Sequence, residues 1–372
     1  MRLEVNRLSP VAMRWRRPEL ISLLEAISCG RGDLSLDLFD ARTVAWAIQS
    51  GLGPLFYRAV KDNPNNSASP HWPALKAADL TARVVMGDHL EAMIEILDAC
   101  RGQIPPITLL KGISIAEECY PEPYLRLMRD LDFLVQKESL PTVKIVLEQL
   151  GYRQRCDDCA ELYDNHHHAA PFFHEEKNVW IEVHHGLFSP KRKASSARVF
   201  QPQTLLAQSR QSQFQGREVR RLTLELQLVY LATHWAQDFQ TVGGMVALVD
   251  AICLLKHAGG ELRWAWILNS VSGSIAASSL YLLLSYIDRY RLAQVAPGIL
   301  HELFVAQPSF GKLSLRAAHA ITDRYCVTGK PLGRLLNKSM MVLWQMLIRP
   351  RLALGSVRTP FDLSVPRRHR AR

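Results

Sequence analysis

The stretch that decides the fold spans residues 109–135 and reads LLKGISIAEECYPEPYLRLMRDLDFLV. A short apolar run, Ile107–Leu110, lies between a proline pair and Gly112 and predicts a buried strand. At the other end, apolar and polar residues alternate over Leu131–Val135, and a period of two predicts a second strand. Between them we expect a short helix, Ile113–Tyr120, and then a loop stiffened by two prolines.

The chain that follows extends this α/β unit. Leu140–Leu150 has a helical apolar stripe, with Ser139 as a plausible N-cap and Gly151 at its end. His166–His174 and Val179–His185 predict two strands on either side of a polar turn. We therefore expect the order β-α-β-α-β-β over roughly residues 104–188.

Both flanks of this unit have the apolar spacing of helices. The predicted helical segments are Leu20–Ile27, Val44–Val60, Ala74–Cys100, Thr223–Gln237, Met245–His257, Arg263–Val271, Ser278–Arg291 and Pro331–Arg349, and the chain is expected to be helical from about Arg198 onward. The sequence thus predicts an α+β protein with a small mixed sheet. We divide it into an N-terminal helical region (1–102), an α/β core (103–200), a C-terminal helical domain (201–349) and a basic tail (350–372).

The composition of the 372 residues is that of a folded protein, with 48% hydrophobic and 22% charged residues. Such a chain can bury a sizeable core, and this excludes wholesale disorder and collagen-like structure. Seven cysteines, thinly spread, do not suggest a disulfide framework, so we expect reduced thiols. The first twenty residues carry five arginines and no apolar export segment, and no apolar run is long enough for a membrane span. We therefore expect a cytoplasmic protein without stable membrane insertion.

The net charge of +10 is concentrated at the C-terminus, where residues 350–372 hold six arginines against the single acid Asp362. Such a tail is compatible with binding to nucleic acid or to an anionic surface. A solvated, frayed terminus is the simpler interpretation. Both readings stay open on the sequence alone.

Three acidic residues carry the chemistry that the pattern suggests. Asp130 and Asp132 stand two residues apart on a predicted strand, so they project to the same side, about 6.5–7 Å apart. Two such carboxylates repel each other unless a cation lies between them, and Mg²⁺ prefers carboxylate oxygens together with substrate phosphates. Glu182, flanked by apolar residues on another predicted strand, is costly to bury unless it is paired or ligating. Together they suggest a metal site for phosphoryl transfer.

A phosphate-binding element is expected at Lys111-Gly112, where a strand gives way to a helix. Glycine lets backbone N–H groups approach an anion, and the helix N-terminus adds its dipole. Lys111 and Ser114 can supply a positive charge and a hydroxyl donor to the phosphates. Each of these signals is weak alone. Their order along the chain is far more specific: a strand that leads into Lys-Gly, a helix, an Asp-x-Asp strand and then a strand that carries a glutamate.

This ordered set resembles the uncharacterised nucleotidyltransferase family of the DNA polymerase β-like superfamily. The resemblance is carried by residues 109–135 and by VWIEVHHGLF at 179–188, which match a strand into Lys-Gly, a Tyr-Pro loop, an Arg before Asp-x-Asp, and a Glu-x-His strand. It extends to GLGPLFYRAV at 51–60 and HHHAAPF at 166–172, and to the C-terminal positions His234, Asp250 and Arg263-Trp264. It covers most of residues 40–290.

The resemblance implies metal-dependent transfer of a nucleoside monophosphate from a nucleoside triphosphate (NTP), with release of pyrophosphate. It implies that Asp130, Asp132 and Glu182 are the catalytic ligands of Mg²⁺ or Mn²⁺ and that Lys111 and Gly112 form the phosphate loop. The remaining expected nucleotide contacts are Ser114, Arg126, Arg129 and His184. The acceptor, a hydroxyl or a phosphate on a small molecule, an RNA or a protein, is not identified.

Two departures from the broader superfamily pattern support a second hypothesis. Ile113 follows Gly112 where Gly or Ser is usual, and Arg129 stands directly before Asp130 where small residues are usual. Arg129 either pairs with an aspartate in place of a metal or contacts phosphate. The alternative is therefore a catalytically inactive protein that keeps the fold as a binding or regulatory module.

Other polar clusters have weaker patterns. The histidines near 166–185, with the Cys156–Cys159 pair, are a conceivable zinc site. Strand alternation would place His166 and His168 on one face and His167 on the other, which argues against it. A buried hydrogen bond between His234 and Asp250 is the simplest account of those two residues, and the basic segment 191–193 is expected to be a solvated loop.

Overall fold

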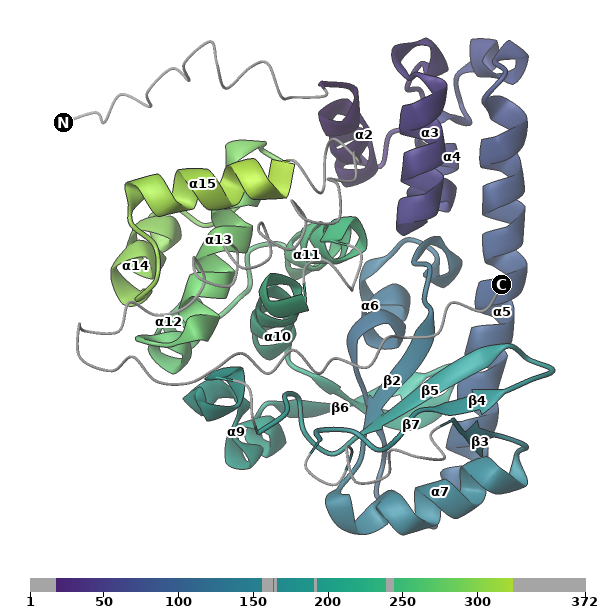
Figure 1. Cartoon of the computed structure of the whole chain (residues 1–372), viewed down its shortest axis with the longest axis vertical. Helices are drawn as coiled ribbons and strands as arrows, with labels where there is room; N and C mark the ends of the chain where they lie inside the picture. Colours follow the sequence, from purple (N-terminus) through teal and green to yellow (C-terminus); the bar gives the residue numbers. More distant parts are fainter. Residues whose placement is uncertain (1–17, 156–162, 164–165, 191–192, 239–243, 324–372) are drawn as a thin grey trace.

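The computed structural model describes residues 18–155, 163, 166–190, 193–238 and 244–323. Within these residues, helices from both ends of the chain surround one mixed sheet (Figure 1). The expected α+β class is confirmed. The predicted helix Pro331–Arg349, the basic tail, Cys156, Cys159 and the pair Lys191-Arg192 lie outside the described residues.

The N-terminal region is helical as expected, and its elements are α2 (Pro18–Cys29), α3 (Ala41–Ala47), α4 (Gly53–Val60) and α5 (Trp72–Cys100). The segment predicted as one helix over Val44–Val60 is interrupted, because Gly51 has a φ of +83° that glycine adopts without a steric penalty. The polar break is also found, with Asn63 capping a short 3₁₀ turn. The long helix α5 then leads to the sheet.

The strands of the described residues form one seven-stranded sheet in the order β3-β4-β5-β2-β1-β7-β6. Their bounds are β1 Thr108–Leu109, β2 Asp130–Leu134, β3 Arg153–Gln154, β4 Phe172–His174, β5 Val179–His184, β6 Ser209–Phe214 and β7 Arg217–Leu222. Helix α6 (Lys111–Cys119) connects β1 to β2, and α7 (Leu140–Gln149) follows β2. The predicted β-α-β-α-β-β order is thus found, with the short β3 added.

The hairpin β6–β7 corrects the expectation of continuous helix after Arg198. Between Arg198 and the hairpin the chain forms a 3₁₀ turn, Arg198–Phe200, and the short helix α9 (Pro202–Ala207). The two-residue turn of the hairpin, Gln215-Gly216, has φ values of +46° and +76°, as tight hairpin turns require. Its strands are rich in Arg, Gln and Ser, so they lack the apolar alternation that reveals a strand. The sheet therefore continues past residue 200, where we expected the α/β core to end.

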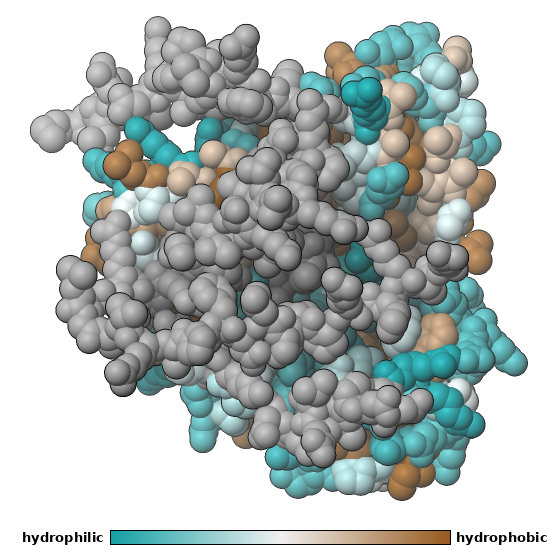
Figure 2. Space-filling view, in the orientation of Figure 1, coloured by the Kyte–Doolittle hydropathy of each residue, from teal (hydrophilic) through white to brown (hydrophobic). Residues whose placement is uncertain are grey.

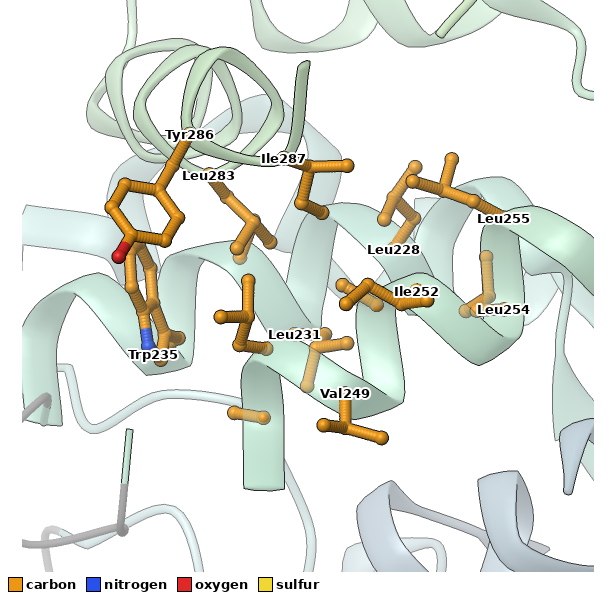
Figure 3. Close-up of a cluster of buried hydrophobic side chains, with 14 of the residues drawn as sticks. Leu228, Leu231, Trp235, Val249, Ile252, Leu254, Leu255, Leu283, Tyr286 and Ile287 are labelled. Carbon is orange, nitrogen blue, oxygen red and sulfur yellow. The ribbon is translucent and has the colours of Figure 1, made fainter. Parts of the chain in front are cut away.

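The C-terminal helices match the sequence prediction at α10 (Leu224–Asp238), α11 (Gly244–Ala258), α12 (Trp264–Val271) and α13 (Ile275–Arg289). Two further helices, α14 (Ile299–Ala306) and α15 (Lys312–Thr322), lie in the part of the chain that was expected to be helical, although the sequence analysis did not give their bounds. Figure 3 shows how α10, α11 and α13 interlock, with Leu231, Ile252 and Leu283 pointing toward one another. These helices pack against the N-terminal helices α2–α4 in one continuous core.

A second core lies under the sheet, where α5 and α7 cover the face that carries Leu131, Phe133, Ile181 and Val183. All four of these side chains are at most 1% exposed. The opposite face of β2 and β5 is thereby left for the polar residues. The structure does not test the division into four regions, which stays a prediction.

The surface of the described residues is mixed. Figure 2 shows apolar residues gathered over the N-terminal helices, and Leu80 and Val84 on α5 are 53% and 65% exposed. None of the helices in the described part of the chain is long and apolar enough to cross a membrane. The cysteines in the described part, Cys29, Cys100, Cys119 and Cys253, are free thiols.

Replacing Leu283 by Ala should destabilise the protein by about 2–5 kcal/mol, because the side chain is fully buried between α10, α11 and α13 and its loss leaves a cavity. Urea unfolding measures the change. The matched control is Leu313→Ala on α15, where the side chain is 80% exposed. An equal loss of stability in the two variants would show that Leu283 is not buried between these three helices.

Candidate active site

The parallel pairing of β2 and β5 brings the predicted acidic residues together. Asp130 pairs with Trp180, Asp132 with Glu182, and Leu134 with His184. Paired residues of parallel strands project to the same face. Because the other face is buried against α5 and α7, Asp130, Asp132, Glu182 and His184 all lie on the polar face.

Asp132 is the centre of this cluster. Its Oδ1 accepts a hydrogen bond from Lys111 Nζ at 2.8 Å, and it lies 2.8 Å from His184 Nε2. Glu182 Oε2 lies 3.7 Å from the same His184 nitrogen. Asp132, Glu182 and His184 each offer one ligand atom, and these atoms lie within 4.8 Å of one another. All three side chains are at most 10% exposed.

The charges of this cluster are balanced by its own cations. Burial opposes ionisation of Asp132, but Lys111 and the hydrogen bond from His184 outweigh it and hold its pKa well below the ordinary value. Burial also opposes ionisation of Glu182, and its contact with His184 still lowers its pKa. Burial would lower the pKa of Lys111, yet the attraction of Asp132 raises it. The cations of the cluster therefore favour the ionised forms of Asp132 and Glu182.

His184 shares the polar face with Glu182, as strand alternation predicts. Burial and the nearby Lys111 charge lower its pKa, while its contacts with Asp132 and Glu182 raise it, and the net shift is upward. Its ring is fully buried, and its Nδ1 has no hydrogen-bond partner among the described residues.

Asp130 lies at the start of β2, where it is half-buried. Its charge is close enough to raise the pKa values of Lys111 and Arg126. It is thus the most accessible carboxylate of the group, at the edge where the deeper Asp132 site meets solvent.

The Lys111-Gly112 element forms the entry of α6. Lys111 has a φ of +44°, in the left-handed region that non-glycine residues adopt at a steric cost. No side chain caps the helix at Leu110, so the backbone N–H groups of its first turn keep their capacity to bind an anion. Ser114, in the next turn, is buried, and its carbonyl accepts a hydrogen bond from Arg221.

Position 112 requires glycine because other side chains pack closely against its Cα, not because of its φ angle. A Cβ at this position would lie 2.7 Å from Arg126 Nη1 and 2.9 Å from Met128 Cγ. Arg126 is itself held in place, because its Nε and Nη2 donate to the two oxygens of Asp250 on α11, at 3.2 and 2.8 Å. The Tyr120 hydroxyl donates to the same carboxylate at 2.7 Å.

This network was missed in the sequence, which suggested His234 as the partner of Asp250. That pairing is wrong, because among the described residues Asp250 bonds to Arg126 and Tyr120. The sequence does contain one signal for this network, because Asp250 is an acidic residue within an otherwise apolar helix. The network binds a C-terminal helix directly to the entry of α6.

Arg129 does not neutralise the aspartates. Its side chain is exposed and forms no ion pair with a described residue, whereas the cation on Asp132 is Lys111. This corrects the proposed pairing of Arg129 with the carboxylates. The expected phosphate contact of Arg129 and the nucleotide contacts of Ser114, Arg126 and His184 stay predictions.

The three consecutive histidines also differ from expectation. His167 does not turn to the far face, because its ring centroid lies 5.2 Å from that of His184 and 4.3 Å from that of His166. The chain bends at residues 166 and 167 instead of continuing as a strand, so alternation does not apply. His168 Nε2 lies 4.0 Å from Glu182 Oε2, at the edge of the carboxylate cluster.

The α+β fold, with the Asp-x-Asp strand β2 paired to the strand that carries Glu182, is consistent with the nucleotidyltransferase class of folds. The family model of uncharacterised nucleotidyltransferases matches residues 40–291, and the chain belongs to this family. Neither the curated proteins nor the solved structures yielded a match.

Gly112→Ala should destabilise the protein by about 1–3 kcal/mol, because the new methyl group must displace an Arg126 that is fixed by Asp250. Thermal unfolding measures the change. Gly87→Ala on α5 is the control, since a Cβ there meets nothing within 4 Å, and it should stabilise the helix by up to about 1 kcal/mol. A stabilising effect of both substitutions would contradict the close approach.

Proposed function

We propose that this protein transfers a nucleoside monophosphate from an NTP to a hydroxyl or phosphate group of an acceptor, with release of pyrophosphate. The observation that carries this proposal is the placement of Asp132 beside Glu182 on adjacent strands, with Lys111 at the entry of α6. Membership of the nucleotidyltransferase family supports nucleotidyl transfer in general. The proposal goes beyond family membership in three respects: the metal, the triphosphate donor and the class of acceptor.

The donor set fits a hard divalent cation such as Mg²⁺ or Mn²⁺. The pKa values of Asp132 and Glu182 are lowered, which favours their ionised forms, and the hydrogen bonds of Asp132 with described residues fall on Oδ1, so Oδ2 is left to bind an ion. Asp130, Asp132 and Glu182 would hold the metal, and His184 would orient Asp132. A bound cation supplies positive charge to the phosphate oxygens as charge develops there.

The chain's own residues then bind and orient the reactants. Lys111 and the first-turn N–H groups of α6 bind the β- and γ-phosphates, and the Ser114 hydroxyl supports them. Glu182 orients the acceptor hydroxyl and takes its proton. The acceptor oxygen bonds to the α-phosphorus as the bond to pyrophosphate breaks. Arg126, Arg129 and His184 are proposed as further nucleotide contacts.

We also propose a cytoplasmic location, which the free thiols of the described residues support. Nucleic-acid binding through the basic tail is a proposal that rests on the sequence of residues 350–372 alone.

Asp130→Ala and Asp132→Ala should each lower the rate of NTP cleavage by at least about 100-fold, because each removes a ligand worth several kcal/mol in the transition state. Glu182→Gln should slow the reaction more than it weakens NTP binding, since it keeps the shape of the side chain. Release of labelled pyrophosphate from NTP labelled at the β-phosphate, in a cell extract that supplies the unidentified acceptor, measures the rate. Asp33→Ala, at an exposed acid far from β2 in the sequence, is the control. Full activity in both aspartate variants would reject the assigned roles.

The Lys111–Asp132 ion pair favours a second candidate function, binding without turnover, because it already neutralises one carboxylate. A thermal-shift series with NTP, with and without Mg²⁺, separates the two. The enzyme predicts stabilisation by NTP that requires the metal, about 2.7 kcal/mol at 100 times the dissociation constant. Equal stabilisation with and without Mg²⁺ would instead support the binding module.

A further inference from the structure

The consecutive histidines His166, His167 and His168 form a second cluster of ligand atoms beside the carboxylate site. Each offers one ring nitrogen, and these nitrogens lie within 4.8 Å of one another. The ring centroids are 4.2 to 4.8 Å apart. Three adjacent residues of a regular strand cannot do this, so the bend of the chain creates the cluster.

The backbone holds this bend from both sides. The N–H of His166 donates to the carbonyl of Tyr163 at 3.0 Å. The carbonyl of His167 accepts from the N–H groups of His185 and Gly186, at 2.9 and 3.1 Å, just after β5. His168 forms an antiparallel bridge with His184. The backbone positions of the three histidines are therefore fixed before any ligand binds, which lowers the entropic cost of binding a metal ion.

The tautomer of His168 suits metal binding. Its Nδ1 lies 2.7 Å from the carbonyl oxygen of Ala169, and because a carbonyl only accepts, Nδ1 carries the proton. The lone pair is therefore on Nε2. A histidine that donates one ring N–H to a backbone carbonyl and presents the other nitrogen is the usual arrangement of a metal ligand.

His167 provides an independent signal. Its Nδ1 is buried and has no hydrogen-bond partner among the described residues. A buried polar atom without a partner costs about 1–3 kcal/mol. Coordination to a cation would remove this cost, whereas a purely structural role for the ring leaves it.

We propose that His166, His167 and His168 bind one divalent transition-metal ion of the zinc class, with the fourth position open to water or to an anionic group. Imidazole nitrogen suits zinc, cobalt or nickel, whereas carboxylate oxygen suits magnesium or manganese. Three histidines with an open position are a known donor set for zinc. The two adjacent clusters thus select different metals, and Glu182 Oε2, 4.0 Å from His168 Nε2, lies between them. This inference goes beyond the proposed function and does not depend on turnover.

The test is a Co²⁺ titration of chelator-treated full-length protein in excess Mg²⁺, followed by the visible absorption of nitrogen-bound cobalt. We expect one Co²⁺ per chain, displaced by Zn²⁺. His167→Asn should weaken binding at least about tenfold. His257→Asn, at an exposed histidine on α11, should leave it within about threefold. No saturable cobalt band, or binding by His167→Asn as tight as by the wild-type protein, would overturn the proposal.

A second measurement needs no variant of the cluster. Diethyl pyrocarbonate modifies accessible histidines, and mass spectrometry locates them. Saturation of the wild-type protein with Zn²⁺ should reduce modification of the peptide that contains residues 166–168 several-fold and leave His257 and His301 unchanged, because both of those are exposed on helices. Equal modification of residues 166–168 with and without Zn²⁺ would contradict the site. Because this readout involves no NTP, failure of the proposed transfer reaction would not affect it.

Discussion

The in-register pairing of β2 with β5 is the constraint on which the site depends. It places Asp132 directly beside Glu182, and His184 lies two residues further along β5 on the same face. A slip of one residue would send Glu182 into the apolar layer. The register is held from the other face, where Leu131, Phe133, Ile181 and Val183 are buried against α5 and α7. The packing of one side of the sheet therefore sets the geometry of the polar cluster on the other.

The entry of α6 is fixed in turn by a helix distant in the sequence. Asp250 on α11 holds Arg126, and Arg126 packs so closely on Gly112 that no side chain fits there. Lys111, next to that glycine, has left-handed backbone geometry and directs its ammonium group to Asp132. Breaking a buried ion pair by removing one partner costs about 3–5 kcal/mol, so Arg126 and Asp250 can fix this geometry firmly. Helix α11 is therefore part of the structure that supports the candidate site.

The sequence predicts those parts whose signals are local. The period of two in β2 and β5 and the helical period in α5, α10 and α11 depend on neighbouring residues, and the structure agrees with them. The hairpin β6–β7 was missed because arginines such as Arg221, buried against Glu117, hide its alternation. The Arg126–Asp250 pair joins residues 124 positions apart, which no local pattern reveals. The convergence of the histidines at 166–168 depends on a bend that the strand-like pattern around them conceals.

The most direct test of the account is a crystal structure of the protein with Mn²⁺ and a non-hydrolysable NTP analogue, because manganese is located by its anomalous scattering. The account predicts a manganese peak between the carboxylates of Asp132 and Glu182, with the triphosphate against Lys111 and the first turn of α6. A triphosphate bound elsewhere, or manganese without contact to either carboxylate, would contradict it.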